Sequence, residues 1–266
     1  SRPRCVALTS PAARLAMDQA VDRAKRRGLG AAGLVRATHL GRLGTFTERA
    51  AQRGCVAMMW LGGLGTERPS VPHGGARPLY GTNPVSFAFP AGDVGPALLD
   101  YATTKIAGGK IMVALDKGKP LEPGSLVDRD GRPSTRPEDF FEGGAILPFG
   151  EHKGYALAFF AQLLGQSLTG ADETAGERPG SETFSRAGAF FLAVDPGLFR
   201  PAEEAREAAR AFRSEVRATP PAPGFDRVRA PGDPELEARR ARAQELVLPK
   251  PTLDAIRQTA ASLGLR

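Results

Sequence analysis

Helix-type and strand-type segments alternate along this chain, and this alternation constrains the fold more than any other feature. Ser10 and Pro11 open a stretch with apolar residues at helical spacing, which Gly28 ends. Residues 31–38 then have the pattern of a strand, residues 45–53 that of a helix, and residues 55–61 that of a fully buried strand. Repeated exchange between the two element types predicts an α/β protein.

The remaining elements continue this pattern with longer turns between them. We predict further strands over 85–89, 97–101, 189–194 and 225–230, and helices from about 105, over 154–168, over 201–217 and twice near the end. Residues 154–168 are apolar on most faces, so that helix is expected to be buried. Residues 62–84 and 118–144 are rich in turn-forming residues, and we expect a long surface loop and a loop or small lid there.

The charge and apolar patterns argue against nucleic-acid and membrane binding. Lys and Arg number 36 against 29 Asp and Glu, but both signs alternate along the predicted helices, and only 7% of residues are aromatic. No apolar run approaches the roughly 18 residues of a membrane-spanning helix. Cys5 and Cys55 lie in apolar contexts typical of core thiols, and no leader-type segment opens the chain. We therefore expect a cytoplasmic protein.

The glycines at 28, 30 and 33 fit the dinucleotide-binding pattern G-x-G-x-x-G. That pattern requires the glycines to follow a strand and open a helix, so that helix amides point at the pyrophosphate. Here the predicted order is reversed, because a helix precedes the glycines and a strand follows them. We interpret this match as a helix C-cap and turn.

Three segments contain candidates for chemistry. His39 follows a predicted strand and precedes a glycine-bearing turn, where an imidazole can exchange protons near neutral pH, although a backbone-bonded histidine is the alternative. Lys153 and Gly154 open a predicted helix, a suitable place for a phosphate or carboxylate. Asp100 ends a predicted strand and precedes a helical run, where its carboxylate can be the N-cap of that helix. For Asn83, before Pro84, a role in shaping the turn is favoured.

Taken together, these segments resemble the malate/L-lactate dehydrogenase family of nicotinamide-dependent oxidoreductases, whose fold is not a conventional Rossmann fold. The resemblance extends over nearly the whole chain and implies a bound NAD or NADP. It implies that His39 is the catalytic acid/base partner of hydride transfer. The matching segments are Thr38-His39-Leu40-Gly41, Gly81-Thr82-Asn83-Pro84, Asp100-Tyr101-Ala102, Gly109-Lys110, Leu147-Pro148, Lys153-Gly154-Tyr155 and Pro231-Gly232-Asp233-Pro234. The residues implied to contact the cofactor are Asp100, Tyr101, Ala102, Lys153, Gly154, Gly232, Asp233 and Pro234. For Asp100 the implied role is to accept a hydrogen bond from a ribose hydroxyl, which is the alternative to capping the helix that follows.

The resemblance also implies an architecture. We expect a mixed sheet and a cofactor-binding lobe over 81–221, inserted between 1–80 and 222–266, which form a substrate and dimerisation lobe. The expected assembly is a homodimer.

The implied activity is hydride transfer between the cofactor and a small 2-hydroxy or 2-oxo acid, with reduction of a cyclic imino acid as an alternative. Relatives carry a further N-terminal helical segment with a Ser-His-Gly element and an arginine, and this sequence starts after it. A degenerate member that binds cofactor or a partner without turnover is therefore a further alternative. His73 and His152 have no additional ligands at metal-site spacing, so no metal is expected.

Overall fold

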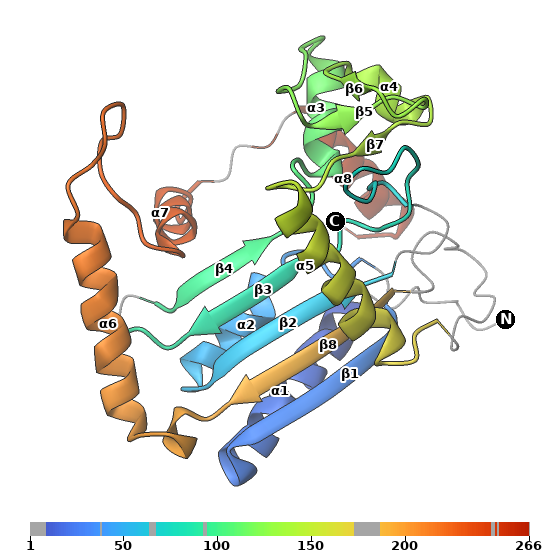
Figure 1. Cartoon of the computed structure of the whole chain (residues 1–266). Coiled ribbons are helices and arrows are strands. Elements are labelled where there is room, and N and C mark those ends of the chain that lie inside the picture. Colours follow the sequence, from blue (N-terminus) through green and yellow to red (C-terminus); the bar gives the residue numbers. More distant parts are fainter. Residues whose placement is uncertain are drawn as a thin grey trace, which may run out of the picture.

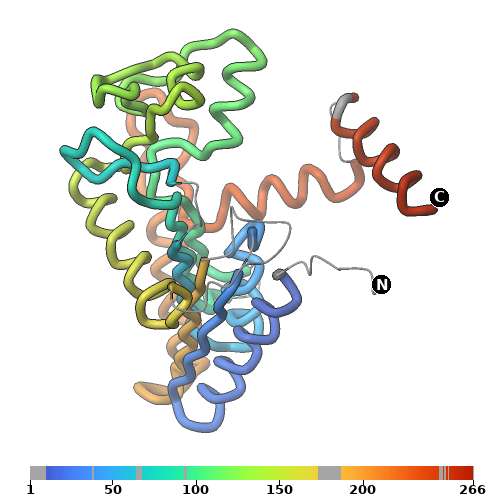
Figure 2. The backbone as a smooth tube through the Cα atoms, turned by 90° about the vertical axis from the view of Figure 1, so that its right-hand side faces the viewer, coloured from blue at the N-terminus to red at the C-terminus, as the bar shows by residue number. Residues whose placement is uncertain are grey.

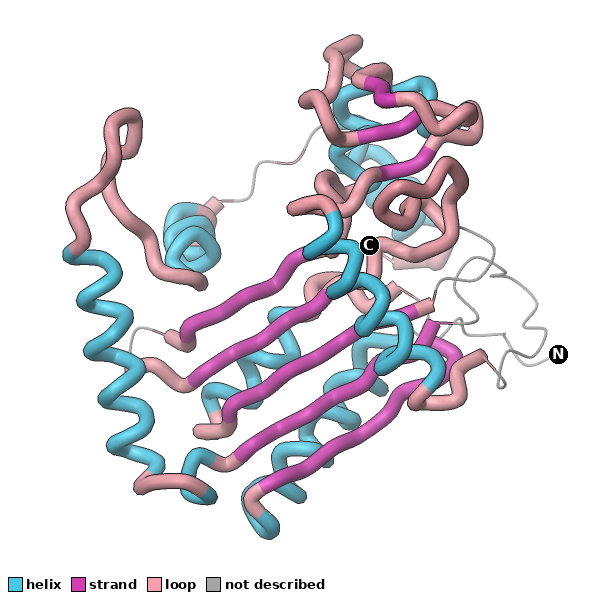
Figure 3. Tube along the Cα trace, viewed as in Figure 1, coloured by secondary structure: helices cyan, strands magenta, loops and turns pink. Residues whose placement is uncertain are grey.

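The computed structural model describes residues 9–37, 39–63, 68–92, 95–172, 187–245, 248 and 250–265. In this part of the chain the expected mixed α/β fold is confirmed. A five-stranded sheet with helices on both faces forms the main body, and a three-stranded sheet lies apart from it (Figures 1 and 3). Cys5 and Thr38 fall outside the described residues.

The main sheet has the strand order β1-β8-β2-β3-β4, and each neighbouring pair is antiparallel. The expectation of a mixed sheet is therefore wrong for this sheet. Strands β1 and β2 run in the same direction, but β8, which comes much later in the chain, lies between them and runs the opposite way. The strands are β1 Leu29–Ala37, β2 Val56–Gly62, β3 Val85–Phe89, β4 Ala97–Tyr101 and β8 Ala187–Val194.

Helices α1 (Thr9–Arg27) and α2 (Gly44–Gln52) cover one face of this sheet (Figure 1). Their apolar sides meet the sheet in a core in which Met17, Phe46, Met59 and Phe191 are almost completely buried. Helix α1 ends at Gly28, whose φ of 82° suits glycine and whose amide donates to the carbonyl oxygen of Ala24 at 2.7 Å. The interpretation of the glycine pattern as a helix end is confirmed, because a helix precedes it and β1 follows it.

Helix α5 (His152–Gln162) and a π-helical turn (Leu163–Ser167) lie across the other face (Figure 1). The predicted helix is present, but the expectation that it is buried on most faces is wrong. Helix α5 packs through its small residues Gly154, Ala158 and Ala161, whereas Phe159 and Phe160 are 42% and 59% exposed. Among the described residues, no second layer of helices covers the outer side of α5.

The second sheet lies in the region where we expected a loop or small lid. Its order is β6-β5-β7, and together with two helices it encloses the buried residues Ile111, Leu121, Leu126 and Ile146. Strands of two residues are too short to show a periodic pattern in sequence. The elements are α3 Gly108–Asp116, β5 Leu126–Val127, β6 Pro133–Ser134, α4 Pro137–Phe141 and β7 Ala145–Ile146.

The division into lobes at residues 81 and 221 stays a prediction. Strands from both sides of the predicted boundary near residue 81 pair in the main sheet, as β2 with β3 does over Ala57–Trp60 and Val85–Ala88.

The last part of the chain is helical. A 3₁₀ turn (Pro196–Leu198) leads into α6 (Ala202–Ala218), followed by α7 (Asp233–Ala241) and α8 (Lys250–Ser262), which stands away from the sheet in Figure 2. The predicted strand over 225–230 is wrong: this segment is a loop, and its first residue, Phe225, is 70% exposed. Among the described helices, none has the length and apolar character needed to cross a bilayer.

Candidate functional site

One edge of the main sheet collects most of the predicted site segments. Ala37 of β1, Gly62 of β2, Val85 of β3 and Tyr101 of β4 end or begin their strands there. We refer to it as the Tyr101 edge. Because these strands alternate in direction, segments that are distant in sequence enter and leave the sheet at the same edge.

Three motifs that were identified separately in the sequence are in direct contact at this edge. The amide and the hydroxyl of Thr103 both donate to the carbonyl oxygen of Thr82, at 3.0 and 2.9 Å. The amide of Phe149 donates to the carbonyl oxygen of Thr103 at 3.1 Å. The segments 81–84, 100–104 and 147–154 therefore form one continuous structure at the end of β4.

Asn83 fixes helix α5 to this structure. Its side chain is buried, and Nδ2 donates to the carbonyl oxygen of Ala158 at 2.9 Å and to Oε1 of Gln162 at 3.0 Å. The same Oε1 accepts from the amide of Gly63 at 2.9 Å. The role expected for Asn83 was to shape the turn before Pro84; the contacts of its side chain show a different structural role, because they hold α5 against the start of β3.

The first turn of α5 contains the predicted phosphate-binding pair. Lys153 is exposed, whereas Gly154 is buried so close to the preceding turn that a Cβ there would clash with the carbonyl oxygen of Phe149. No side chain caps the start of this helix. Its amide dipoles and the Lys153 ammonium thus present positive charge at the surface beside the Tyr101 edge.

His73 lies against this helix start, with its ring centroid 6.0 Å from that of His152. Within the described residues, no three His, Cys, Asp or Glu side chains are grouped as a metal site requires.

Asp100 and Tyr101 are neighbours in sequence but serve opposite faces of the sheet. The Tyr101 ring lies 5.3 Å from that of Phe149, on the α5 side, and half-buried Ala102 follows it. Oδ2 of Asp100 accepts from the amide of Gly44 at 2.7 Å, on the α2 side. Asp100 therefore binds the start of a helix other than the one that follows it. Burial raises the pKa of Asp100, and the Gly44 amide and Arg42 partly offset that effect.

His39 is exposed on the turn between β1 and α2. The amide of Gly41 donates to Nδ1 of His39 at 3.1 Å. This acceptor role at Nδ1 means that the neutral ring carries its proton on Nε2. The turn begins at the β1 side of the Tyr101 edge and ends at Gly44, beside Asp100 of β4. It thus crosses four strand spacings, or about 19 Å.

The closing motif lies at the other end of β4. The carbonyl oxygen of Pro231 accepts from the amide of Leu98 at 3.3 Å, Gly232 is the N-cap of α7, and exposed Pro234 lies in its first turn. Asp233 is buried, and its carboxylate is bound by the guanidinium groups of two α6 arginines and by the amide of Ala230. The contacts are 2.7 Å from Arg213, 2.5 and 2.8 Å from Arg217, and 2.9 Å from Ala230. The hydrogen bond from Arg217 holds the pKa of Asp233 far below its ordinary range.

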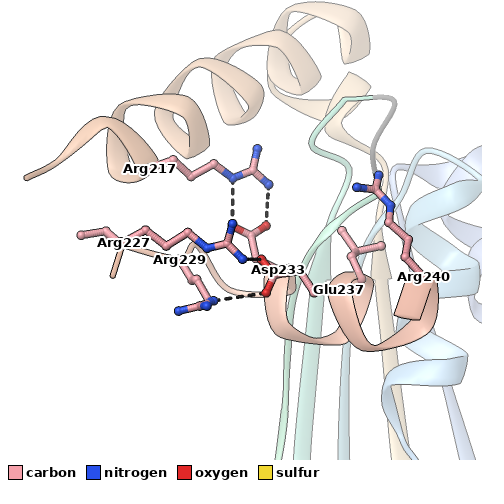
Figure 4. A pocket seen from close by; sticks show the side chains of 8 residues that line it. Arg217, Arg227, Arg229, Asp233, Glu237 and Arg240 are labelled. Atoms are coloured by element: carbon pink, nitrogen blue, oxygen red, sulfur yellow. Dashed lines mark hydrogen bonds and ion pairs between the residues drawn. The ribbon is translucent and has the colours of Figure 1, made fainter. Parts of the chain in front are cut away.

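A pocket of about 290 Å³ opens beside this anchor, at the junction of α6 and α7 (Figure 4). The arginines in it are largely paired with acids: Arg217 with Asp233, and Arg227 and Arg229 with Glu237. Asp233, one of the predicted cofactor contacts, lines this pocket, whereas His39, Asp100 and Lys153 do not, so the pocket does not bring the two groups of predicted residues together. Its lining residues are Arg217, Arg227, Val228, Arg229, Asp233, Leu236, Glu237 and Arg240.

Sequence reasoning missed a set of charged residues beneath the His39 turn. Nη1 of Arg42 lies 3.4 Å from Glu48, and its Nε lies 3.7 Å from Asp100. Two nitrogens of Arg239 on α7 contact the Glu48 carboxylate at 2.8 Å each, and this contact lowers the pKa of Glu48. The only sequence signal was the position of Arg42 within the glycine-bearing turn.

Comparison with known proteins agrees with this arrangement of motifs. The sequence profile of the malate/L-lactate dehydrogenase family matches residues 6–257. The chain is 31% identical to a Delta(1)-pyrroline-2-carboxylate/Delta(1)-piperideine-2-carboxylate reductase from Pseudomonas syringae pv. tomato, over 96% of this chain and 73% of that protein. It is 34% identical to a (2R)-3-sulfolactate dehydrogenase (NADP(+)) from Chromohalobacter salexigens, over 96% and 74%. The crystal structure of malate dehydrogenase from Entamoeba histolytica superposes with a TM-score of 0.87 at 25% identity, over 96% of this chain and 74% of that one.

Proposed function

This chain belongs to the malate/L-lactate dehydrogenase family, and we propose that it is an NAD(P)-dependent dehydrogenase that interconverts a small 2-hydroxy acid and its 2-oxo acid. One observation carries the proposal: adjacent residues of β4 join the two predicted halves of the site. Asp100 holds the end of the turn that carries His39, and Tyr101 contacts Phe149 at the start of α5. Named relatives that act on hydroxy acids support the substrate class.

His39 is the proposed proton partner of the substrate oxygen. In the arrangement with Gly41, the neutral ring directs an N–H from Nε2, which would hold the C2 carbonyl oxygen of a 2-oxo acid by a hydrogen bond. To deliver a proton to that oxygen the ring must be the imidazolium, which returns to neutral imidazole, and its Nδ1–H cannot accept from the Gly41 amide. To accept a proton at Nε2 from the hydroxyl of a 2-hydroxy acid, the ring must exchange its tautomer and release the Gly41 amide. Proton exchange and the turn conformation are thus coupled in this proposal.

The residues at the start of α5 fit a phosphate-bearing cofactor. The start of α5, at which no side-chain cap is formed, and exposed Lys153 would hold a phosphate group, and the half-exposed Tyr101 ring lies beside them. Of the first-turn amides, that of Lys153 already donates to the carbonyl oxygen of Gly150 at 3.1 Å and would have to release it to bind the phosphate. When bound, the nicotinamide group supplies or takes up the hydride. Asp233 fits less well, because two arginines and an amide already bind its carboxylate. Asp100 could bind the cofactor only through Oδ1, because its Oδ2 already accepts from the Gly44 amide, and its side chain lies on the α2 face of the sheet.

A cyclic imino acid is the second candidate substrate, because a relative of 31% identity is named a pyrroline and piperideine carboxylate reductase. His39 would then donate to or protonate the imine nitrogen instead of a carbonyl oxygen. The geometry of His39 is compatible with either group, so the substrate has to be decided by assay.

A homodimer in the cytoplasm completes the proposal. On the face that α5 only partly covers, Trp60 packs against Phe87 and Phe190, with ring centroids 5.3 and 5.8 Å away, and all three are half-buried. Phe159 and Phe160, on the helix that lies across this face, are also exposed. A surface of this kind supports association with a second copy. Cys55 is a buried free thiol, which is in keeping with a reducing compartment.

The test has two steps. Titration of NADH and NADPH, followed by the change in their fluorescence, measures cofactor binding; loss of absorbance at 340 nm is then measured with a panel of 2-oxo acids and with piperideine-2-carboxylate. Turnover of a 2-oxo acid is the expected result. Turnover of the imino acid alone identifies the second candidate, and binding without any turnover identifies a non-catalytic member. Absence of binding to either cofactor contradicts the proposal.

A further inference from the structure

The turn that carries His39 is held by side chains from three other parts of the fold. Its last amide, that of Gly44, donates to Asp100 on β4. Arg42, in the middle of the turn, faces Asp100 with Nε and Glu48 of α2 with Nη1. Glu48 in turn accepts two hydrogen bonds from Arg239 of α7. A single guanidinium group therefore connects the turn to β4, to α2 and, through Glu48, to α7.

The packing around Gly44 shows how closely these groups fit. A Cβ on Gly44 would lie 2.8 Å from Oδ2 of Asp100 and 3.0 Å from Nη2 of Arg42. The guanidinium group thus folds back over the first residue of α2. Arg42, Glu48 and Arg239 also line one small pocket with Gly232 and Leu98, between α2, the start of β4 and α7. The His39 turn therefore lies close to the first residues of α7.

We infer that Arg42 is a positioning residue for His39, which it serves by fixing the 39–44 turn against Asp100 and Glu48. This inference rests on the proposed dehydrogenase function. The planar guanidinium group presents donors in fixed directions to two carboxylates from different elements at once, whereas the ammonium group of a lysine is a compact charge on a flexible stem and lacks this fixed geometry. Arg42 is 36% exposed, so its ion pairs contribute little to stability, and its main effect is on the geometry of the turn.

The test compares Arg42→Met with Arg49→Met. Each removes one arginine, Arg42 from the turn before α2 and Arg49 from α2 itself, but Arg49 binds Asp18 on α1, at 2.8 and 3.0 Å. We expect Arg42→Met to lower kcat on the order of 10-fold, with KM for the nicotinamide cofactor nearly unchanged, because a displaced proton partner affects the chemical step. Arg42→Lys should recover part of the loss, and Arg49→Met should retain the wild-type kcat.

Hydrogen exchange separates this inference from the proposed function. The amides of 40–44 should exchange faster in Arg42→Met than in Arg49→Met, whether or not a substrate has been found. If the wild-type protein turns over no substrate, the dehydrogenase proposal fails while the exchange experiment still reports on the turn. Equal exchange in the two variants, or equal kcat in an active enzyme, overturns the assignment of Arg42.

Discussion

Asp100 and Tyr101 point to opposite faces of the main sheet, and through them β4 connects the helix that follows His39 with the helix that begins at His152. Asp100 binds the amide of Gly44, whereas Tyr101 contacts Phe149. Adjacent residues of a strand always alternate in this way. A cofactor bound on one face of the sheet therefore cannot contact both side chains. Because Asp100 faces α2, we expect its main role to be structural.

Replacement of Asp100 should affect stability more than cofactor binding. Asp100→Ala removes the acceptor of the Gly44 amide and should lower the free energy of unfolding by about 1–2 kcal/mol. Asp100→Asn retains an oxygen acceptor without the cost of burying a charge, so it should be close to wild type at pH 7. Urea denaturation of the two variants measures the difference. Equal losses in both would show that the charge, and not the acceptor, is required.

His39→Gln should lower kcat about 100-fold or more, because the amide can hold an oxygen but cannot exchange a proton with it. Binding of NADH or NADPH, measured by fluorescence, should remain within about twofold, since His39 is assigned to the substrate. Arg49→Met is the control, because Arg49 of α2 binds Asp18 on α1 and belongs neither to the His39 turn nor to the start of α5. Wild-type turnover by His39→Gln would remove His39 from the mechanism.

Asp233 should be essential for stability, and its effect should depend on pH. Asp233→Asn leaves the buried guanidinium of Arg213, which is 4% exposed, without its counter-charge, and the expected loss is about 3 kcal/mol. Because the pKa of Asp233 is lower in the folded protein than in the unfolded chain, its stabilisation is present above about pH 4 and is lost as the pH falls. Urea denaturation measured between pH 7 and pH 3 should therefore show a larger fall in the free energy of unfolding for wild type than for Asp233→Asn. Parallel pH profiles would contradict this role.

The sequence predicted local elements well and their long-range arrangement poorly. Helix α1 and strand β1 were predicted because Ser10, Pro11 and Gly28 mark the helix ends, and these signals act over a few residues. The insertion of β8 between β1 and β2 leaves no local signal, and neither do two-residue strands such as Leu126–Val127. Within the site, the motif segments were found, but the partners of Asp100 and Asp233 are arginines far away in sequence or on other elements. Charge pairs of this kind follow from the fold and not from spacing.

If two copies associate through the face of the sheet that α5 partly covers, a charge placed on that face should change the oligomeric state. Phe160→Asp places a charge in the apolar surface and should convert a dimer into a monomer at micromolar concentration, measured by light scattering after size exclusion. Phe199→Asp is the matched control, because Phe199 is 80% exposed and precedes α6, away from α5. A dimer that persists in Phe160→Asp, or a monomeric wild type, would exclude this surface as the interface.

Gly154 provides the sharpest test of the cofactor site, because its replacement changes the position of one helix start without altering charge. The Cβ of alanine at 154 would collide with the carbonyl oxygen of Phe149, so the first turn of α5 must move away from the 147–150 turn. Gly108→Ala is the control: Gly108 opens α3, and a Cβ there has no neighbour within 4 Å. If the amides of α5 and Lys153 hold the cofactor phosphate, Gly154→Ala should weaken NADH or NADPH binding at least about 10-fold, whereas Gly108→Ala should bind as wild type does. Circular dichroism at the assay temperature verifies that both variants are folded. Unchanged binding by a folded Gly154→Ala would show that the start of α5 does not hold the cofactor phosphate. The position proposed for the nicotinamide relative to His39 would then be wrong as well.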